Sequence, residues 1–278
     1  MWWTEMSYKR ILTMQDISCV GQCSMTVALP ILSACGHETC VLPTALLSTH
    51  TGGFGKPQVV HLDEGTDKFL GHWQENGITF DAVLIGYLGS VEAVERAEAI
   101  LDTMVAPHGL KIVDPAMADH GKLYSGLNKD YARAMARLCR KADILLPNVT
   151  EAAMLTGMEY REILEVGYVR QLLEKLENPQ VVLTGVGYRE KETGVALRAG
   201  ERYFHYAHPR MEKSYHGTGD ILAACFAGTL LGGKATEEAA RIAADFTYRC
   251  IQETAKNPAH WYGVKFEPVL PELIQRLI

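Results

Sequence analysis

The segment Gly217-Thr218-Gly219-Asp220 opens a helical run at residues 221–231 and is the strongest candidate for chemistry in the chain. Glycines at a helix start let a ligand approach the backbone, and the first-turn N–H groups point outward without intrahelical partners. With the helix dipole they form an anion site suited to a phosphoryl group in transfer. Asp220 could take the proton from an attacking hydroxyl. The alternative is that Asp220 only complements the dipole of a glycine-rich cap.

Two further carboxylates could serve a metal ion. Asp119 and Glu151 are candidate ligands of Mg²⁺, directly or through water, because phosphoryl transfer needs a hard cation and carboxylate oxygens suit it. Asn148 could reach a phosphate oxygen or a metal-bound water. The plainer interpretation of Asn148 and Glu151 is a helix N-cap with an acidic partner at the third helical position. Capping and metal binding can coexist.

Three more residues could contact a ligand. Tyr87 stands between glycines after an apolar run and either covers an aromatic ligand or is a half-exposed tyrosine. Thr51 and His50 lie in a Gly-rich loop, a common setting for binding residues. A lone loop histidine is usually structural or solvated, and His50 is interpreted in that way.

These residues must be positioned by a sheet, because short β-rich runs alternate with helical runs. Strands are expected at residues 10–15, 38–42, 81–85, 110–113, 143–146 and 180–184, with a hairpin at 192–197 and 202–206. Helices are expected at residues 23–35, 65–75, 91–105, 129–140, 150–155, 162–176, 219–231, 237–253 and 272–277, and a long loop at 43–57. Such alternation predicts a three-layer α/β/α fold, with a mainly parallel sheet and helices on both faces. Ligands bind at the carboxyl ends of parallel strands, where the candidate residues gather.

The composition fits one α/β domain spanning residues 1–278, with no role assigned to residues 1–8. The net charge of −6 argues against nucleic acid as a partner. No apolar run is long enough to span a membrane, and no signal peptide precedes the first strand. The seven cysteines favour reduced thiols in a cytoplasmic protein, and the segment CGHETC at 35–40 lacks a second ligand pair for zinc.

The motifs occur in an order that resembles the pyridoxal (vitamin B6) kinases of the ribokinase-like superfamily. The matching segments are ILTMQ at 11–15, STHTGGFGK at 48–56, GYLG at 86–89, DPAMAD at 114–119, HGKLY at 120–124, ADILLPNVTEAAMLTG at 142–157, VVLTG at 181–185 and GTGD at 217–220. They cover nearly the whole chain. The resemblance implies a ribokinase-like fold and ATP-dependent phosphorylation of the 5′-hydroxymethyl group of pyridoxal, pyridoxamine or pyridoxine, in salvage of the cofactor.

The resemblance also implies roles for individual residues. Asp220 would be the base, and Gly217, Thr218 and Gly219 would line the anion hole. Asp119 and Glu151 would bind the Mg²⁺ ion. Asn148 and Thr184 would contact the ATP phosphates, with Glu151 close by. Thr51 and Tyr87 would contact the pyridine ring. The family also tends to use a monovalent cation, often K⁺, and to form homodimers.

One position departs from the family pattern. These kinases usually carry a glutamine-serine pair after the first strand, and this chain has Gln15-Asp16. A carboxylate facing the ring should favour a protonated pyridinium or a cationic amine by opposite-charge attraction. We therefore expect Asp16 to bias the choice among B6 vitamers, towards pyridoxamine, unless its side chain turns into solvent.

Other functions remain open at this stage. Sugar and nucleoside kinases of the superfamily insert a β lid soon after the first strand, and too few residues separate Gln15 from Cys23 for such a lid. Hydroxymethylpyrimidine kinase, also without a large lid, acts on a similar hydroxymethylated ring and is the main competitor. A catalytically silent vitamin- or nucleotide-binding protein would be expected to lack the base and the metal carboxylates. A nicotinamide-dependent dehydrogenase is disfavoured because no GxGxxG motif follows the first strand.

Overall fold

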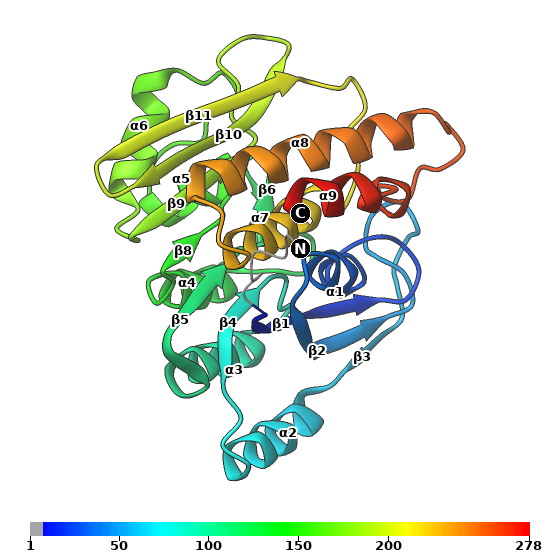
Figure 1. Ribbon diagram of the computed structural model, residues 1–278, viewed down its shortest axis with the longest axis vertical. Coiled ribbons are helices and arrows are strands. Elements are labelled where there is room, and N and C mark those ends of the chain that lie inside the picture. The colour runs from blue at the N-terminus through cyan, green and yellow to red at the C-terminus, as the bar shows by residue number, and fades with distance from the viewer. Residues whose placement is uncertain (1–7) are drawn as a thin grey trace.

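The central feature of the computed structural model, which describes residues 8–278, is a nine-stranded sheet in the order β11-β10-β9-β8-β5-β4-β1-β2-β3 (Figure 1). Its strands are β1 (Arg10–Ser18), β2 (Glu38–Leu47), β3 (Val59–His61), β4 (Phe80–Ile85), β5 (Val105–Val113), β8 (Ile144–Leu145), β9 (Gln180–Thr184), β10 (Glu192–Ala199) and β11 (Arg202–Pro209). Neighbouring strands in the run β9-β8-β5-β4-β1-β2 pair in parallel. Strand β3 joins antiparallel at one edge of the sheet, and β10 and β11 join antiparallel at the other. The mainly parallel sheet is therefore confirmed.

Helices cover both faces of this sheet and form three layers (Figure 1). They are α1 (Met25–Ala34), α2 (Asp63–Glu75), α3 (Val91–Thr103), α4 (Lys129–Cys139), α5 (Val149–Thr156), α6 (Val166–Lys175), α7 (Thr218–Leu231), α8 (Thr236–Ala255) and α9 (Leu270–Leu277). One hydrophobic core lies between the sheet and α3 to α6, and the other lies between the sheet and α1, α7, α8 and α9. Successive strand residues alternate between the two cores, as in Ile11 and Leu12 of β1.

The structure corrects the expected loop at residues 43–57. Strand β2 continues through Pro43 to Leu47, and the short strand β3 follows the loop and pairs with residues 45–47 of β2. Pro43 suggested the end of a strand because it has no backbone N–H. It is tolerated because it pairs with Gln15 of β1 on one side, while β3 reaches only residues beyond it on the other.

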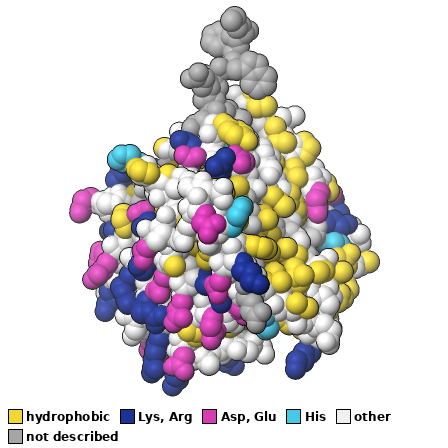
Figure 2. Space-filling model, turned by 90° about the horizontal axis from the view of Figure 1, so that it is seen from below, with side chains coloured by type: hydrophobic (Ala, Val, Ile, Leu, Met, Phe, Trp, Pro, Cys, Tyr) yellow, Lys and Arg dark blue, Asp and Glu magenta, His cyan; other side chains and the backbone are white. Residues whose placement is uncertain are grey.

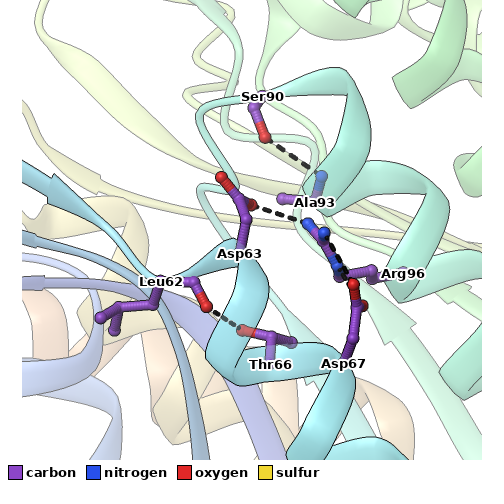
Figure 3. Close-up of polar contacts among 7 residues, drawn as sticks. All are labelled: Leu62, Asp63, Thr66, Asp67, Ser90, Ala93 and Arg96. Atoms are coloured by element: carbon purple, nitrogen blue, oxygen red, sulfur yellow. Dashed lines mark hydrogen bonds and ion pairs between the residues drawn. The ribbon is translucent and has the colours of Figure 1, made fainter.

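Helix α2 is fastened to α3 by one arginine (Figure 3). Arg96 donates to Asp67 at 2.6 Å and to Asp63 at 2.7 Å, and its side chain is 18% exposed. At the start of α3 the Ser90 hydroxyl caps the helix by accepting the Ala93 N–H. The contacts of Arg96 hold α2 beside α3.

Other sequence expectations can be checked on the described residues. The connection from β1 to α1 is short and holds no β lid, as expected. All seven cysteines are free, as expected. No helix within residues 8–278 is long and apolar enough to cross a membrane. The N-terminal segment to which no role was assigned lies outside the described residues except for exposed Tyr8.

Candidate active site

The first turn of α7 presents an open backbone. Gly217 has φ +85°, and a β-carbon there would lie 2.1 Å from the carbonyl oxygen of Gln22. The close approach and the left-handed conformation both require glycine. Gly219 is exposed, and no atom lies within 4 Å of the place where its β-carbon would be. The N-terminus of α7, where Thr218 is the first helical residue, is thus accessible from solvent, and its use as an anion site stays a prediction.

Asp16, at the end of β1, lies close to Asp220 in the first turn of α7. Burial raises the pKa of Asp220 to about 6; the backbone N–H of Ser24 opposes this shift and the charge of Asp16 adds to it. Asp16 is only 3% exposed, so its carboxylate is not turned into solvent. Burial also raises the pKa of Asp16, against hydrogen bonding from the hydroxyls of Ser24 and Ser18; Ser18 Oγ donates to Asp16 Oδ2 at 3.1 Å.

Tyr87 completes this part of the site. It follows β4, the neighbour of β1, and its carbonyl oxygen accepts the Asp16 N–H at 3.2 Å. Burial raises the pKa of the Tyr87 hydroxyl, and the charge of Asp16 adds to the shift. The structure therefore brings Asp16, Tyr87 and Asp220 together from three separate elements.

Glu151 and Asn148 form the capping box that the sequence suggested, at the start of α5. The Asn148 side chain accepts the Glu151 N–H at 2.9 Å, and Glu151 Oε2 accepts the Asn148 N–H at 2.9 Å. Glu151 Oε1 accepts from Met117 at 2.8 Å and from Ala118 at 3.3 Å. Burial raises the pKa of Glu151 to about 7, against these three backbone N–H groups. Asn148 also forms a parallel bridge with Thr184 at the end of β9, so both lie at one sheet edge.

Asp114 is a site residue that the sequence analysis did not single out. It directly follows β5, and its pKa is raised well above the usual range by burial and by the charges of Glu151 and Asp220. No lysine or arginine among the described residues contributes to this shift. Its position just after a strand, the signal already applied to Asp16, could have identified it. Asp119 in contrast is half-exposed, and its Oδ1 accepts the His120 N–H at 2.8 Å.

The loop at residues 48–57 lies against the segment that precedes α7. His50 is buried; its Nδ1 accepts the Gly52 N–H at 2.9 Å and its Nε2 donates to the Tyr262 carbonyl at 3.2 Å. The ring of His50 lies 5.1 Å from that of His216. His50 is therefore structural, as interpreted from the sequence. Thr51 is exposed on this loop, and no hydrogen bond joins it to the other candidate residues.

The acidic residues fit a hard cation. Burial raises the pKa of Asp114, Glu151 and Asp220, and the charges of Glu151 and Asp220 raise that of Asp114 further, so a cation beside Asp114 would relieve this repulsion. Within residues 8–278 no group of three or more His, Cys, Asp or Glu could hold a metal ion by side chains alone. A few carboxylates that do not enclose a metal by themselves suit Mg²⁺, because this ion keeps several waters and takes further oxygen ligands from substrate phosphates.

With this geometry in place, comparison with known proteins decides the family. Residues 32–264 match the sequence profile of a family described as phosphomethylpyrimidine kinase. The chain belongs to this family. It is accordingly a kinase, a phosphotransferase that acts on a hydroxyl group.

Solved relatives of this kinase confirm its resemblance to the pyridoxal kinases and its ribokinase-like fold. Pyridoxal kinase from Lactobacillus plantarum is 34% identical with a TM-score of 0.90, over 97% of this chain and 98% of that chain. A Bacteroides thetaiotaomicron protein named for the phosphomethylpyrimidine kinases, solved with pyridoxal, is 28% identical with a TM-score of 0.90, over 98% and 96%. Pyridoxal kinase from Leishmania donovani, in complex with ADP and pyridoxamine, shares the fold at 21% identity and a TM-score of 0.84, over 95% of each chain.

Proposed function

We propose that this kinase uses ATP to phosphorylate the 5′-hydroxymethyl group of a vitamin B6 vitamer and yields the 5′-phosphate. The observation that carries the proposal is the meeting of Asp16, Tyr87 and Asp220 beside the open N-terminus of α7. A ring held by Asp16 and Tyr87 would have a hydroxymethyl group within reach of both Asp220 and the anion site. The relatives named for pyridoxal kinase activity support the same substrate class.

In the proposed reaction Asp220 accepts the proton of the substrate hydroxyl as the hydroxyl oxygen attacks the γ-phosphorus of ATP, and the bond from that phosphorus to the leaving ADP breaks. A pKa of about 6 leaves Asp220 mostly ionised at neutral pH while keeping it basic enough to accept the proton. The backbone N–H groups at Gly217, Thr218 and Gly219 face the phosphoryl oxygens as negative charge builds there. Asp16 attracts the pyridinium nitrogen or an amine of the vitamer, and Tyr87 covers the ring.

ATP and its cation occupy the opposite half of the site in this proposal. Asp114, Glu151 and half-exposed Asp119 are the carboxylates that would hold Mg²⁺, which would neutralise charge on the phosphates when bound. Because three backbone N–H groups already occupy the oxygens of Glu151, this residue serves the cation mainly through water. Asn148 and Thr184 lie beside the phosphates. We also propose that a monovalent cation such as K⁺ takes part, as the resemblance to the pyridoxal kinases implies.

Closure of the site is proposed to involve two segments. The loop at residues 48–57 and the segment at 207–216 meet at the rings of His50 and His216, and Thr51 lies on the first of them. Their closure over the bound vitamer would exclude water, which otherwise competes with the hydroxymethyl group for the phosphoryl group. Thr51 would then reach the ring substituents.

We also propose that the whole chain acts as one kinase domain, in the cytoplasm, and forms a homodimer. The free thiols support a reducing compartment. Figure 2 shows hydrophobic side chains gathered on one side of the face that it presents, and Val59, Val60 and Phe69 of β3 and α2 are 43%, 58% and 53% exposed. An exposed apolar edge strand is a surface that proteins usually cover. Light scattering tests the dimer: a monomer at micromolar concentration would refute it, and Val60→Lys should dissociate a dimer formed through β3.

The reaction itself is tested by ATP consumption with Mg²⁺ and K⁺ against pyridoxal, pyridoxamine, pyridoxine and hydroxymethylpyrimidine in parallel. Turnover of any B6 vitamer, lost in Asp220→Ala, supports the proposal. Turnover of hydroxymethylpyrimidine alone would instead make this protein a pyrimidine kinase, in line with the description of its family as phosphomethylpyrimidine kinase. Absence of turnover with all four would refute both assignments.

A further inference from the structure

A small hairpin follows the loop after β5 and carries Asp119. It consists of β6 (Ala118–Asp119) and β7 (Lys122–Leu123), which pair antiparallel. The two residues of its turn, His120 and Gly121, have φ of 48° and 76°. Positive φ at both central positions is typical of the tightest hairpin turns. The path of the chain between the two strands therefore depends on a turn that few residue pairs adopt.

The first turn of α5 holds this hairpin by three side chains. Asn148 Nδ2 donates to the Ala118 carbonyl at 2.7 Å, and Glu151 Oε1 accepts the Ala118 N–H at 3.3 Å. Thr150 Oγ1 accepts the Gly121 N–H at 3.1 Å. The contacts of Asn148 and Glu151 thus act at the start of β6, whereas the contact of Thr150 reaches the turn itself.

The contact between Thr150 and the turn is protected from water. Thr150 is 2% exposed, so water cannot readily replace its hydroxyl as the acceptor of the Gly121 N–H. Tyr160 packs against the same glycine, because a β-carbon on Gly121 would lie 2.9 Å from Tyr160 Cδ1. The turn is therefore held by one side chain from the start of α5 and by another from the segment after this helix.

The orientation of the Asp119 carboxylate depends on the same turn. Asp119 Oδ1 accepts the His120 N–H at 2.8 Å, and Asp119 Oδ2 lies 3.6 Å from Nε2 of the His120 ring. Both contacts come from the first residue of the turn. A turn that moved would carry the His120 N–H with it, and the carboxylate would lose its fixed direction.

We propose that Thr150 is a positioning residue for the cation of the phosphoryl transfer: by fixing the turn between β6 and β7 it keeps the Asp119 carboxylate oriented for Mg²⁺. The inference rests on the proposed function, in which Asp119 is one of the carboxylates that would hold this ion. The effect passes from the Thr150 hydroxyl to the Gly121 N–H, through the turn to the His120 N–H, and from there to Asp119.

The affinity for ADP, measured by calorimetry with Mg²⁺ and with EDTA, tests this role without turnover. Thr150→Val keeps the shape of the side chain and leaves the Gly121 N–H without its acceptor. We expect the Kd for ADP in Mg²⁺ to rise about fivefold or more, and the Kd in EDTA to change by less than about twofold. Thr150→Ala should repeat the loss with a smaller side chain. Thr150→Ser keeps the hydroxyl and should retain the affinity in Mg²⁺.

A role that acts through Asp119 requires that the two substitutions do not add. In an Asp119→Asn background, Thr150→Val should change the Kd for ADP in Mg²⁺ by less than about twofold. Hydrogen exchange followed by mass spectrometry reports the turn directly and needs no ligand. The amides of residues 118–122 should exchange faster in Thr150→Val than in the wild type, because the Gly121 N–H is no longer held.

The matched control is Thr254→Val. Thr254 is also fully buried, and its Oγ1 also accepts a backbone N–H from another segment, that of Lys265 at 2.8 Å. This variant should have a lower Tm, while the ratio of the Kd values for ADP in EDTA and in Mg²⁺ stays as in the wild type.

Several outcomes would overturn the positioning role. They are a wild-type Kd for ADP in Mg²⁺ in Thr150→Val, a loss that adds to that of Asp119→Asn, unchanged exchange of residues 118–122, and binding of ADP by the wild type that does not depend on Mg²⁺. A wild-type protein that binds ADP with Mg²⁺ but phosphorylates no vitamer would instead refute the proposed function and leave the role of Thr150 to be decided by the affinities.

Discussion

Glu151 accepts a hydrogen bond of 2.8 Å from the backbone N–H of Met117 and so ties the loop after β5 to the start of α5. That loop begins with Asp114, whose pKa is raised by burial and then by the charge of Glu151. The same carboxylate therefore shapes the backbone of the site and contributes to the negative potential that would attract a cation. A change at Glu151 should affect stability and catalysis together.

We expect Glu151→Gln to lower the free energy of unfolding by about 1–3 kcal/mol, because the amide nitrogen would face a buried backbone N–H with no acceptor. Urea denaturation measures this loss, and kcat should fall at least about tenfold as the loop moves. Asn128→Ala is the control: it removes a cap at α4 that accepts from Asp130 and Tyr131, both at 3.0 Å, for about 1 kcal/mol. Similar kinetic losses in the two variants would contradict a special role for Glu151.

The pH profile of kcat should report Asp220. Because burial raises its pKa to about 6, the ionised base is lost as pH falls through that value, and kcat should drop about tenfold per unit below it. Asp16→Asn removes a charge that raises this pKa, so the midpoint should move to lower pH. Steady-state rates from pH 5 to 8 give both midpoints. An unshifted midpoint in Asp16→Asn would show that the two carboxylates are not coupled.

Replacement of Asp16 by the serine usual in the family should change the ranking of vitamers. Asp16 is buried beside Tyr87, so its charge acts on a ligand with little screening by water. In Asp16→Ser we expect kcat/KM for pyridoxamine to fall relative to pyridoxine. The measurement is kcat/KM for each vitamer at one pH, with Ser18→Ala as a variant that removes only a neighbouring hydroxyl. An unchanged ranking would exclude Asp16 as the selecting residue.

Several site residues could be predicted from the sequence because parallel strands bring their carboxyl ends to one edge. Asp16, Tyr87 and Asn148 were placed correctly at that edge by this rule alone. The rule could not rank Asp114 above Asp119, because the path of the loop between them depends on the Glu151 contacts. Which carboxylate of this loop serves a cation stays a prediction.

Features that depend on backbone torsion angles or on contacts between distant segments could not be predicted from the sequence. The positive φ of Ser24 carries no sequence signal, since serine rarely adopts it. Strand β3 was missed because three residues give too short a pattern, and its pairing with β2 follows from where the chain returns after the loop. The hydrogen bond of His50 to Tyr262 joins segments far apart in the chain, so it could not be predicted from the sequence either.

Loss of Arg96 should loosen α2 without affecting catalysis, because its ion pairs join α2 to α3 and include none of the candidate site residues (Figure 3). We expect Arg96→Met to lower the free energy of unfolding by about 1 kcal/mol, more than an isolated surface pair contributes, because the arginine is mostly buried and contacts two aspartates. Arg133→Met is the control, since its pair with Asp130 is 76% and 74% exposed and should contribute almost nothing. Urea denaturation compares them, and a kinetic defect in Arg96→Met would contradict this assignment.

Alanine at the two glycines of α7 should have opposite effects on stability. Gly217→Ala places a β-carbon 2.1 Å from the Gln22 carbonyl at φ +85°, so the variant should unfold at a clearly lower temperature. Gly219→Ala meets no atom within 4 Å, and alanine in a helix should raise stability by about 0.5–1 kcal/mol. If the anion site is where we place it, the added methyl of Gly219→Ala enters the space of the phosphoryl group, and kcat should fall although the protein is more stable. Thermal melts and steady-state kinetics on both variants separate the effects, and a fully active Gly219→Ala enzyme would move the phosphoryl group away from this helix end.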